Sequence, residues 1–347
     1  MTPLTGTIAG TGDEYAAGGA AYFAFVNANG GIYGRKIRVV VKDDSYKPNQ
    51  TLALTRQLLA EDKPLALFGF VGTGNVTTLN KNKVLKDANI ALLAPYTGAQ
   101  DLREPMSPNI FHIRASYTDE TARMVEHLHT IGLRRLRVMY QDDPFGKSGL
   151  AGAENALQKL GLKAVAKGGY ARSKPEEVDA AVTAIAAADP DAIIMVSVNR
   201  ASSAFVKKMR EKGSKARLFS ISVVNFKKLL KNAGEERARG IGISQVMPYP
   251  YSPLVPAARE FQTLIKDYHP EKVVSYASME SFIAAKILVE AIRRSGADPT
   301  RQKIMIQLDK MNSYDVGGFK VSFSPQNHTG SKFVEVTVIG RDGKLLR

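Results

Sequence analysis

The sequence contains no cysteine, and this absence removes several classes of chemistry at once. Disulfide bonds, thiolate nucleophiles and zinc sites with sulfur ligands are excluded. No segment reaches the ~18 consecutive apolar residues of a membrane-spanning helix. Residues 1–19 also lack the basic and apolar regions of a signal peptide. The lack of cysteine suits either a cytosolic or an exported protein and does not decide between them.

Motifs for nucleotide binding and catalysis are missing as well. The run Gly-Lys-Ser at 146–148 resembles the end of a phosphate-binding loop, but Gln141 stands where that motif needs its first glycine. Neither a dinucleotide-binding glycine motif nor a nucleophile elbow is present. His127 and His129 are two apart on an expected helix, so they face different directions and cannot chelate a metal together. We therefore expect no catalytic residue, no metal site and no cofactor.

Paired acidic residues occur at two expected strand ends, Asp43-Asp44 and Asp142-Asp143. In an enzyme such pairs could act as acid and base or bind a metal. At strand ends they are more often helix caps or turn residues, and we favour that interpretation.

The composition is that of a globular protein with an excess of positive charge. The 347 residues are 44% apolar and 23% charged, and 48 Lys and Arg against 33 Asp and Glu give a net charge of +15. Such a charge raises the possibility of nucleic-acid binding. However, the basic residues are dispersed along helices, and no arginine-rich tract, RNA-binding aromatic motif or zinc pattern accompanies them. A solvated basic surface, without a nucleic-acid partner, is the better interpretation.

The most informative stretch is 64–99. Two apolar runs, 64–71 and 89–94, are separated by a helical pattern, which predicts parallel strands in a βαβ unit. Each run ends in a Gly/Thr-rich turn, Gly72–Asn75 and Pro95–Ala99. In open parallel sheets, ligands bind outside the carboxyl ends of the strands. Both turns lie there, and their hydroxyls and backbone N–H groups, beside a helix N-terminus, can donate hydrogen bonds to a carboxylate. Simple turn and cap chemistry remains an alternative for both loops.

The same alternation of strands and helices runs through most of the chain. We expect a Gly/Thr loop over 2–11, a helix over 13–29 and a buried strand over 37–41. A second series of strands and helices follows residue 114, and a Pro-rich connector occupies 247–251. Two strands, 319–323 and 332–339, form an expected terminal hairpin. The pattern predicts an α/β protein with two doubly wound lobes.

The run 27–37 (NANGGIYGRKI), followed by 43–48 (DDSYKP), resembles the N-terminal signature of one family. It is the periplasmic solute-binding protein of the branched-chain amino-acid ABC transporter type, with the type I periplasmic binding fold. The resemblance covers essentially the whole chain. It implies two Rossmann-like lobes joined by three crossover segments, with the ligand enclosed when the lobes close. One lobe would comprise 1–115 with 248–315, and the other 116–247 with 316–347.

The resemblance also implies which residues contact the ligand. In the first lobe, Thr73 matches the hydroxyl position that holds the ligand's carboxylate. Tyr96, Thr97 and Gly98 match the segment that supplies backbone and hydroxyl contacts to the carboxylate and the amine.

In the second lobe, Phe145 matches an aromatic residue that closes over the ligand. Asn199 stands where amino-acid binders commonly have an aromatic residue, and Gln245 is a further candidate hydrogen-bonding residue at the rim. Ser222 stands where an acidic residue often pairs with the ammonium group. Because a buried ammonium without an anionic partner is costly, this departure argues against a classical α-amino acid and favours a neutral or purely anionic ligand, such as a small carboxylic or aromatic acid, unless Asp143, Glu280 or another carboxylate compensates.

The function implied by the resemblance is capture of a small carboxylate-bearing ligand, an amino acid or a related organic or aromatic acid, between two closing lobes for the membrane permease of an ABC transporter. The protein is expected to be periplasmic, monomeric and without enzymatic activity. A ligand-sensing core of a regulator or receptor with the same fold is the alternative, and an α/β enzyme is a third possibility. Family members normally have a central strand and an export leader before the loop corresponding to 3–6. We therefore expect that extending this chain upstream restores an apolar strand.

Overall fold

The computed structural model describes residues 1–162, 166–272 and 274–347. The described chain divides into two compact units, each assembled from separate parts of the sequence. The first unit comprises Met1–Thr97, Asp101–Ala115 and Met247–Lys332. The second comprises Gly98–Gln100, Ser116–Val246 and Phe333–Arg347. Apart from the brief excursion at 98–100, the chain crosses between the units at 115/116, 246/247 and 332/333.

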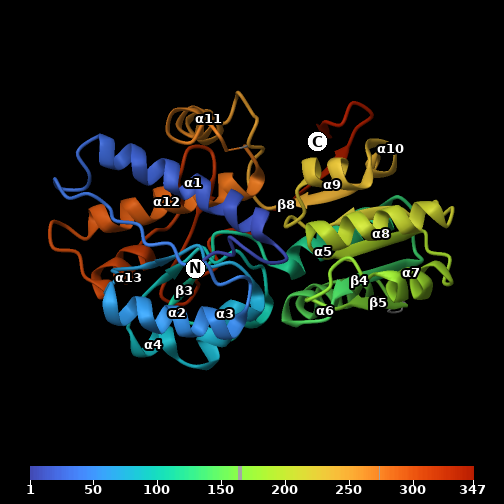
Figure 1. The fold of residues 1–347 in the computed structure, drawn as a ribbon, viewed down its shortest axis with the longest axis horizontal. Helices are drawn as coiled ribbons and strands as arrows, with labels where there is room; N and C mark the ends of the chain where they lie inside the picture. Colours follow the sequence, from blue (N-terminus) through green and yellow to red (C-terminus); the bar gives the residue numbers. More distant parts are fainter. Residues whose placement is uncertain (163–165, 273) are drawn as a thin grey trace. The chain divides into compact units, whose positions relative to one another are not determined.

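The first unit has a parallel sheet between two layers of helices (Figure 1). Its strands pair in the order β1 (Leu67–Phe68), β2 (Leu92–Leu93) and β3 (Ile110–Phe111). Parallel strands that are covered on both faces must be apolar throughout, which explains the uninterrupted apolar runs. The remaining elements are α1 (Ala9–Ala28), α2 (Pro48–Glu61), α3 (Thr73–Lys81), α4 (Val84–Asp87), α11 (Pro256–Tyr268), α12 (Tyr276–Arg294), α13 (Arg301–Asp309), β9 (Tyr314–Asp315) and β10 (Lys320–Val321).

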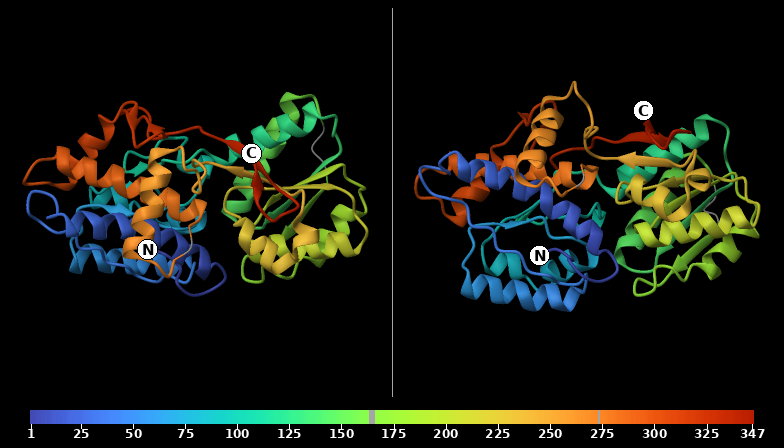
Figure 2. Two further views of the ribbon diagram at one scale, coloured as in Figure 1. Left: turned by 90° about the horizontal axis from the view of Figure 1, so that it is seen from above. Right: turned by 45° about the horizontal axis from the view of Figure 1, so that its top comes forward.

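Two glycines allow α1 to pack closely on α12 (Figure 1, Figure 2). A Cβ atom on Gly18 would lie 1.8 Å from the carbonyl oxygen of Ser278, so only glycine fits there. The next residue, Gly19, donates its N–H to Ser281 Oγ at 2.9 Å. One turn further along, the ring of Tyr22 meets Phe282 edge-on at 5.4 Å. Helix α1 begins at Ala9, so the expected loop over 2–11 is wrong beyond residue 8.

The buried strand expected over 37–41 is also wrong. These residues form no strand, and the side chains of Val39 and Val41 are 49% and 50% exposed. This apolar segment lines a cavity instead of pairing with another strand. Strand β1 lines the same cavity, and its pairing with β2 is on the edge that faces away from the segment.

The second unit contains a seven-stranded sheet in the order β12-β11-β8-β7-β6-β4-β5. Neighbours among β4 to β8 run parallel, whereas β11 is antiparallel to β8 and to β12. The strand order reverses direction after β5, so right-handed crossovers place α6 on one face and α7 to α9 on the other (Figure 1). The strands are β4 (Leu136–Gln141), β5 (Lys167–Tyr170), β6 (Ala192–Val196), β7 (Arg217–Ser220), β8 (Gly242–Gln245), β11 (Glu335–Ile339) and β12 (Leu345–Leu346). The helices are α5 (Tyr117–Thr130), α6 (Pro144–Lys159), α7 (Asp179–Ala186), α8 (Asn199–Glu211), α9 (Phe226–Ala233) and α10 (Glu235–Ala238).

The expected terminal hairpin does not form. Strand β10 pairs with β9 in the first unit, and β11 pairs with β8 in the second. Residues 316–332 therefore belong to the first unit and not to the second lobe, where the sequence had placed them. The physical reason is the packing of Phe323, whose ring meets Phe111 of β3 edge-on at 5.5 Å.

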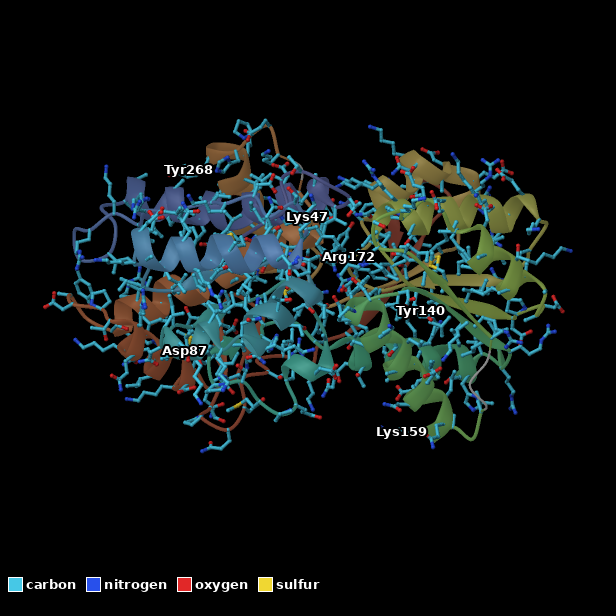
Figure 3. The ribbon with its side chains drawn as sticks, turned by 60° about the horizontal axis from the view of Figure 1, so that its bottom comes forward. Lys47, Asp87, Tyr140, Lys159, Arg172 and Tyr268 are labelled. Carbon is cyan, nitrogen blue, oxygen red and sulfur yellow. The ribbon has the colours of Figure 1, made fainter. Side chains whose placement is uncertain are left out.

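Charged side chains such as Asp87 and Lys159 are exposed at the surface (Figure 3). Among the described residues, none of the helices combines the length and the apolar character that crossing a membrane would require.

Candidate functional site

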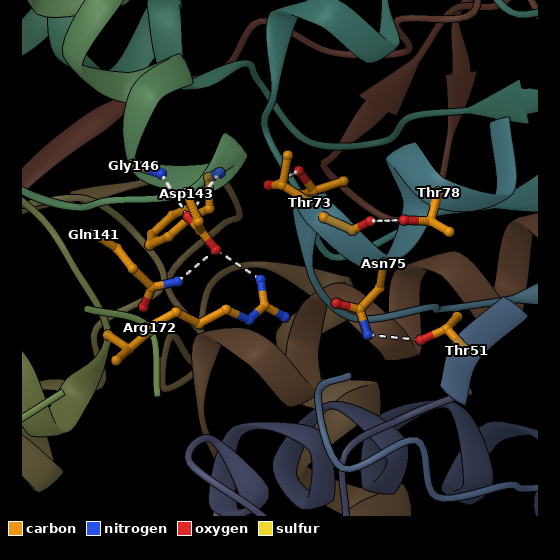
Figure 4. A network of polar contacts seen from close by, with 12 residues as sticks. Thr51, Thr73, Asn75, Thr78, Gln141, Asp143, Gly146 and Arg172 are labelled. Atoms are coloured by element: carbon orange, nitrogen blue, oxygen red, sulfur yellow. Dashed lines mark hydrogen bonds and ion pairs between the residues drawn. The ribbon is translucent and has the colours of Figure 1, made fainter. Parts of the chain in front are cut away.

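The two Gly/Thr loops of the first unit come together at the carboxyl ends of β1 and β2. A parallel bridge joins Val71 to Tyr96, directly beyond the two strands. Thr73 is the first residue of α3, and its Oγ1 lies 2.7 Å from Thr97 Oγ1 (Figure 4). Both side chains are almost fully buried. Because the first N–H groups of a helix have no partner within it, the start of α3 adds donors beside these hydroxyls.

A buried ion pair supports Tyr96. The guanidinium of Arg114 lies over the Tyr96 ring, 4.6 Å from its centre. Arg114 Nη1 is 3.6 Å from Glu280 Oε2, and the two side chains are only 1% and 2% exposed. The ring of Tyr15 lies 4.9 Å from that of Tyr96. Burial and the nearby Glu280 carboxylate raise the pKa of Tyr15, so its hydroxyl stays protonated and donates to Ala94 O at 2.7 Å.

A second buried polar group, which the sequence did not reveal, lies behind the start of α3. Asn75 Nδ2 donates to Thr51 Oγ1 at 2.7 Å (Figure 4) and to Asp44 Oδ2 at 3.1 Å. Thr51 Oγ1 donates to the same carboxylate at 2.6 Å. The neighbouring Asp43 accepts from the backbone of Leu4 and Ser45, which confirms the turn interpretation for that residue. The network ties α2 to α3 and fixes the loop that carries Thr73.

In the second unit, Gly98 and Phe145 both contact Tyr117. Gly98 O accepts from Tyr117 N at 2.6 Å, and a Cβ on Gly98 would lie 2.7 Å from the Tyr117 ring. The ring of Phe145 meets that of Tyr117 edge-on at 5.3 Å, and Phe145 is 3% exposed. The two expected ligand contacts therefore share one aromatic partner.

Asp143 caps α6, which confirms the cap interpretation for this residue. Its Oδ1 accepts from the N–H groups of Phe145 and Gly146 at 3.0 and 3.2 Å (Figure 4). Its Oδ2 accepts from Gln141 Nε2 at 2.8 Å and from Arg172 Nη1 at 2.6 Å. Through the bonds to these backbone N–H groups, Asp143 positions Phe145 at the start of α6.

Ser222 lies against a buried carboxylate from a different element. Glu120, in the first turns of α5, accepts from Ser222 N at 2.8 Å and from Ser222 Oγ at 3.0 Å. It also accepts from Ser244 Oγ at 2.5 Å. Glu120 is fully buried. A buried carboxyl group therefore lies behind position 222, on a residue 102 positions earlier in the chain.

The other two expected site residues of this unit, Asn199 and Gln245, form hydrogen bonds to neighbouring segments of the same unit. Asn199 begins α8, and its Oδ1 accepts from Asn225 N at 2.8 Å. Gln245, at the end of β8, is 2% exposed and donates to Thr337 Oγ1 of β11 at 3.3 Å. Phe145, Asn199 and Ser222 follow β4, β6 and β7, so they lie at one edge of the parallel sheet.

Each unit thus offers a different electrostatic environment. The first combines hydroxyls with a helix N-terminus, which suits an anion, while the buried Arg114 cation beside Tyr96 is paired with Glu280. The second combines Ser222 with the Glu120 carboxylate, which suits a donor or a cation. Among the described residues, no group of three or more His, Asp or Glu side chains could hold a metal ion.

The whole chain is similar to known periplasmic proteins. A family model described as "Periplasmic binding protein" matches residues 1–344. A substrate-binding periplasmic protein from Ralstonia solanacearum has a solved structure that is similar to this one, with a TM-score of 0.94 and 37% identity over 99% of this chain and 97% of that one. A possible leucine/isoleucine/valine-binding protein from Rhodopirellula baltica SH 1 gives the same TM-score with 27% identity, over 100% of this chain and 94% of that one. An "Amino acid binding protein" of Pseudomonas aeruginosa is 28% identical over 82% of this chain and 76% of its own length.

Proposed function

The chain belongs to the family of periplasmic binding proteins, and from this premise we propose that it is the extracytoplasmic solute-binding component of an ABC importer. Proteins of this family bind substrates and are not enzymes, so the bound solute is released chemically unchanged. The partners in this proposal are a small carboxylate-bearing solute and a membrane permease that receives it.

The observation that carries the proposal is the buried hydroxyl pair of Thr73 and Thr97. In this hydrogen-bonded pair one hydroxyl donates to the other, which leaves the proton of the second hydroxyl for a carboxylate, and the N–H groups at the start of α3 add further donors. Beneath them, Thr51 of α2 and Asn75 of α3 both bind the Asp44 carboxylate. We assign the ligand's carboxylate to this position.

We assign the ammonium of an α-amino acid to Ser222. The Ser222 hydroxyl donates its proton to Glu120, so towards a ligand its oxygen can only accept a hydrogen bond. A hydroxyl backed by a buried carboxylate favours a cationic donor, and this removes the objection to an amino acid that the sequence raised at position 222. A zwitterionic amino acid is therefore the ligand class that fits both environments best.

A thermal-shift screen of amino acids, aliphatic acids and aromatic acids identifies the ligand to be used below. A ligand that binds only the native state stabilises it by about 2.7 kcal/mol at 100 times its dissociation constant. The best hit then serves as the probe for calorimetric titration.

Thr73→Ala is expected to weaken binding of the best hit by about 10- to 100-fold, because it removes a hydrogen bond to a charged group. The matched control is Thr78→Ala in the same helix, whose hydroxyl donates to Gly74 O at 2.8 Å and should leave affinity unchanged (Figure 4). Calorimetry measures both variants. Equal affinities of Thr73→Ala and the unmodified chain would show that the carboxylate is held elsewhere.

Glu120→Gln is expected to weaken binding of an amino acid about tenfold relative to its des-amino analogue, since only the former carries a cation. The ratio between the two ligands on one variant is the readout, so a general loss of folded protein does not imitate the effect. Glu126→Gln, at an exposed position of the same helix, is the control. A ratio unchanged from that of the original chain would rule out Ser222 as the ammonium position.

A further inference from the structure

The positive charge of the second unit is concentrated in one stretch of the chain. Residues 199–241 contain 12 Lys and Arg against 3 Asp and Glu, whereas the rest of the unit contains 13 of each. The stretch forms α8, β7, α9 and α10 with their connecting loops. Helices α8 and α9 pack side by side, and α10 contacts both of them (Figure 1, Figure 2). The charge excess of this unit is therefore gathered on these helices and the loops between them.

Several cations of this stretch are exposed and form no ion pair with any described residue, because the nearby carboxylates are engaged elsewhere. Glu211 Oε1, at the end of α8, lies 3.8 Å from Arg237 Nη2 of α10. Lys208 Nζ donates to both carboxylate oxygens of Asp179 at 2.6 Å. The unpaired cations, which we call the basic face, are Lys207, Lys212, Lys215, Arg217, Lys231 and Arg239.

A polar hollow of about 510 Å³ lies at the amino ends of β4, β6 and β7. Its acidic lining residues, Asp189 and Asp191, are both bound by Arg135 at 2.8 Å. The charges of the other cations around it are therefore not compensated, which suits an anionic group of the size of a phosphate. These cations are three members of the basic face, Lys212, Lys215 and Arg217.

The basic face has no apolar anchor. Among the described residues, none of the large apolar side chains that are exposed lies within 199–241. Protein–protein interfaces depend on aromatic and aliphatic anchors at a buried centre. Adsorption to anionic lipid headgroups needs only several Lys and Arg side chains near the membrane surface, each of which strengthens binding by about fivefold. The composition of the face therefore favours a lipid surface over a protein partner.

We propose that the basic face docks the second unit on a phospholipid membrane with anionic headgroups. The hollow receives the phosphate of one headgroup, and Lys207 and Lys231 contact its neighbours. Docking leaves the solute-binding edge of this unit uncovered, because Phe145, Asn199 and Ser222 follow the opposite, carboxyl ends of the strands. The inference goes beyond solute binding. It takes from the proposed function only the location outside the cytoplasm, beside the membrane that holds the permease.

The test compares two variants that each lose four positive charges. The basic-face variant carries Lys207→Gln, Lys212→Gln, Lys215→Gln and Lys231→Gln. The control carries the same change at four exposed lysines of the first unit, Lys81→Gln, Lys86→Gln, Lys266→Gln and Lys310→Gln. Both variants are sedimented with vesicles of phosphatidylcholine, either alone or with about one quarter phosphatidylglycerol, in about 0.1 M salt.

The original chain and the control are expected to bind the vesicles that contain phosphatidylglycerol and not those without it. The basic-face variant is expected to bind them at least about 100-fold more weakly, because four contributions of about fivefold each are lost. Raising the salt to about 1 M should release the original chain, since the Debye length falls to about 3 Å. The affinity of both variants for the best solute, measured by calorimetry, should stay unchanged, so this test is independent of the one at Thr73.

Equal binding of the two variants to the anionic vesicles would overturn the proposal. No binding by the original chain, or equal binding to both kinds of vesicle, would overturn it as well. Release of the protein by millimolar inorganic phosphate at constant ionic strength would reassign the hollow to a small free anion. Binding to polyglutamate through the same four lysines, without binding to vesicles, would assign the face to an acidic protein instead.

Discussion

Replacing Glu280 by Gln is expected to lower the free energy of unfolding by about 3–5 kcal/mol. The substitution keeps the shape of the side chain but leaves the Arg114 guanidinium, which is 1% exposed, without its carboxylate at 3.6 Å. Removing one partner of a buried pair is strongly destabilising because the other charge stays buried without compensation. Denaturant unfolding followed by circular dichroism measures the loss.

The same helix offers a control for this prediction. Glu290 also belongs to α12, but it pairs with Arg293 and Arg294 at the surface, where an ion pair contributes at most about 1 kcal/mol. The double variant Arg114→Met with Glu280→Leu should recover most of the lost stability, because an apolar pair of similar volume can replace a buried ion pair. If Glu280→Gln is no more costly than Glu290→Gln, the pair of Arg114 and Glu280 does not support the region around Tyr96.

Gly18→Ala is expected to destabilise the protein by about 3 kcal/mol or more, although alanine is the better helix former by about 1 kcal/mol. The added Cβ would lie 1.8 Å from Ser278 O and 2.7 Å from Ser278 C, which are backbone atoms of α12. One helix must therefore move away from the other, and the edge-on contact of Tyr22 with Phe282 is lost with it. The midpoint of thermal unfolding should fall by about 6–12 °C.

Gly10→Ala supplies the matched substitution in α1. Gly10 is exposed, so the change should be neutral or slightly stabilising there. Opposite signs for the two substitutions are the expected pattern. Similar small effects at both positions would mean that α1 and α12 are not in backbone contact at Gly18.

The loops at the strand ends could be predicted from sequence because their signals are local. The apolar runs before Gly72 and Pro95 predict buried parallel strands, and the turns that follow predict where the hydroxyls gather. The structure brings Thr73 and Thr97 to 2.7 Å from each other, as expected for the carboxyl ends of neighbouring strands.

The charged partners could not be predicted in the same way. Glu120 looks like an ordinary acidic residue in the first turns of a helix, and its partners Ser222 and Ser244 are 102 and 124 positions away. Arg114 and Glu280 are likewise brought together only by the packing of a strand end against α12. No local pattern separates such buried charges from the many solvated ones in a chain of net charge +15.

The error at 37–41 has a different cause. An apolar run of five residues predicts a strand correctly only if a neighbouring strand is available to pair with it. Here the position beside Val39 and Val41 is the cavity, so the segment stays extended but unpaired. The prediction of a terminal hairpin was wrong for a related reason. Strand β10 pairs with β9 and strand β11 pairs with β8, and the spacing of these strands in the sequence does not reveal either pairing.

The interleaving of the two units affects the order in which a growing chain can fold. The parallel strands that the structure describes in the second unit, β4 to β8, have been synthesised by residue 245. The first unit cannot close until α12 and the segment up to Lys332 have left the ribosome. Until then, Gly18 and Tyr22 of α1 lack α12, the helix against which they pack in the folded protein. The central part of the sequence can therefore fold before either end, and the N-terminal residues, although synthesised first, are among the last to reach their final packing.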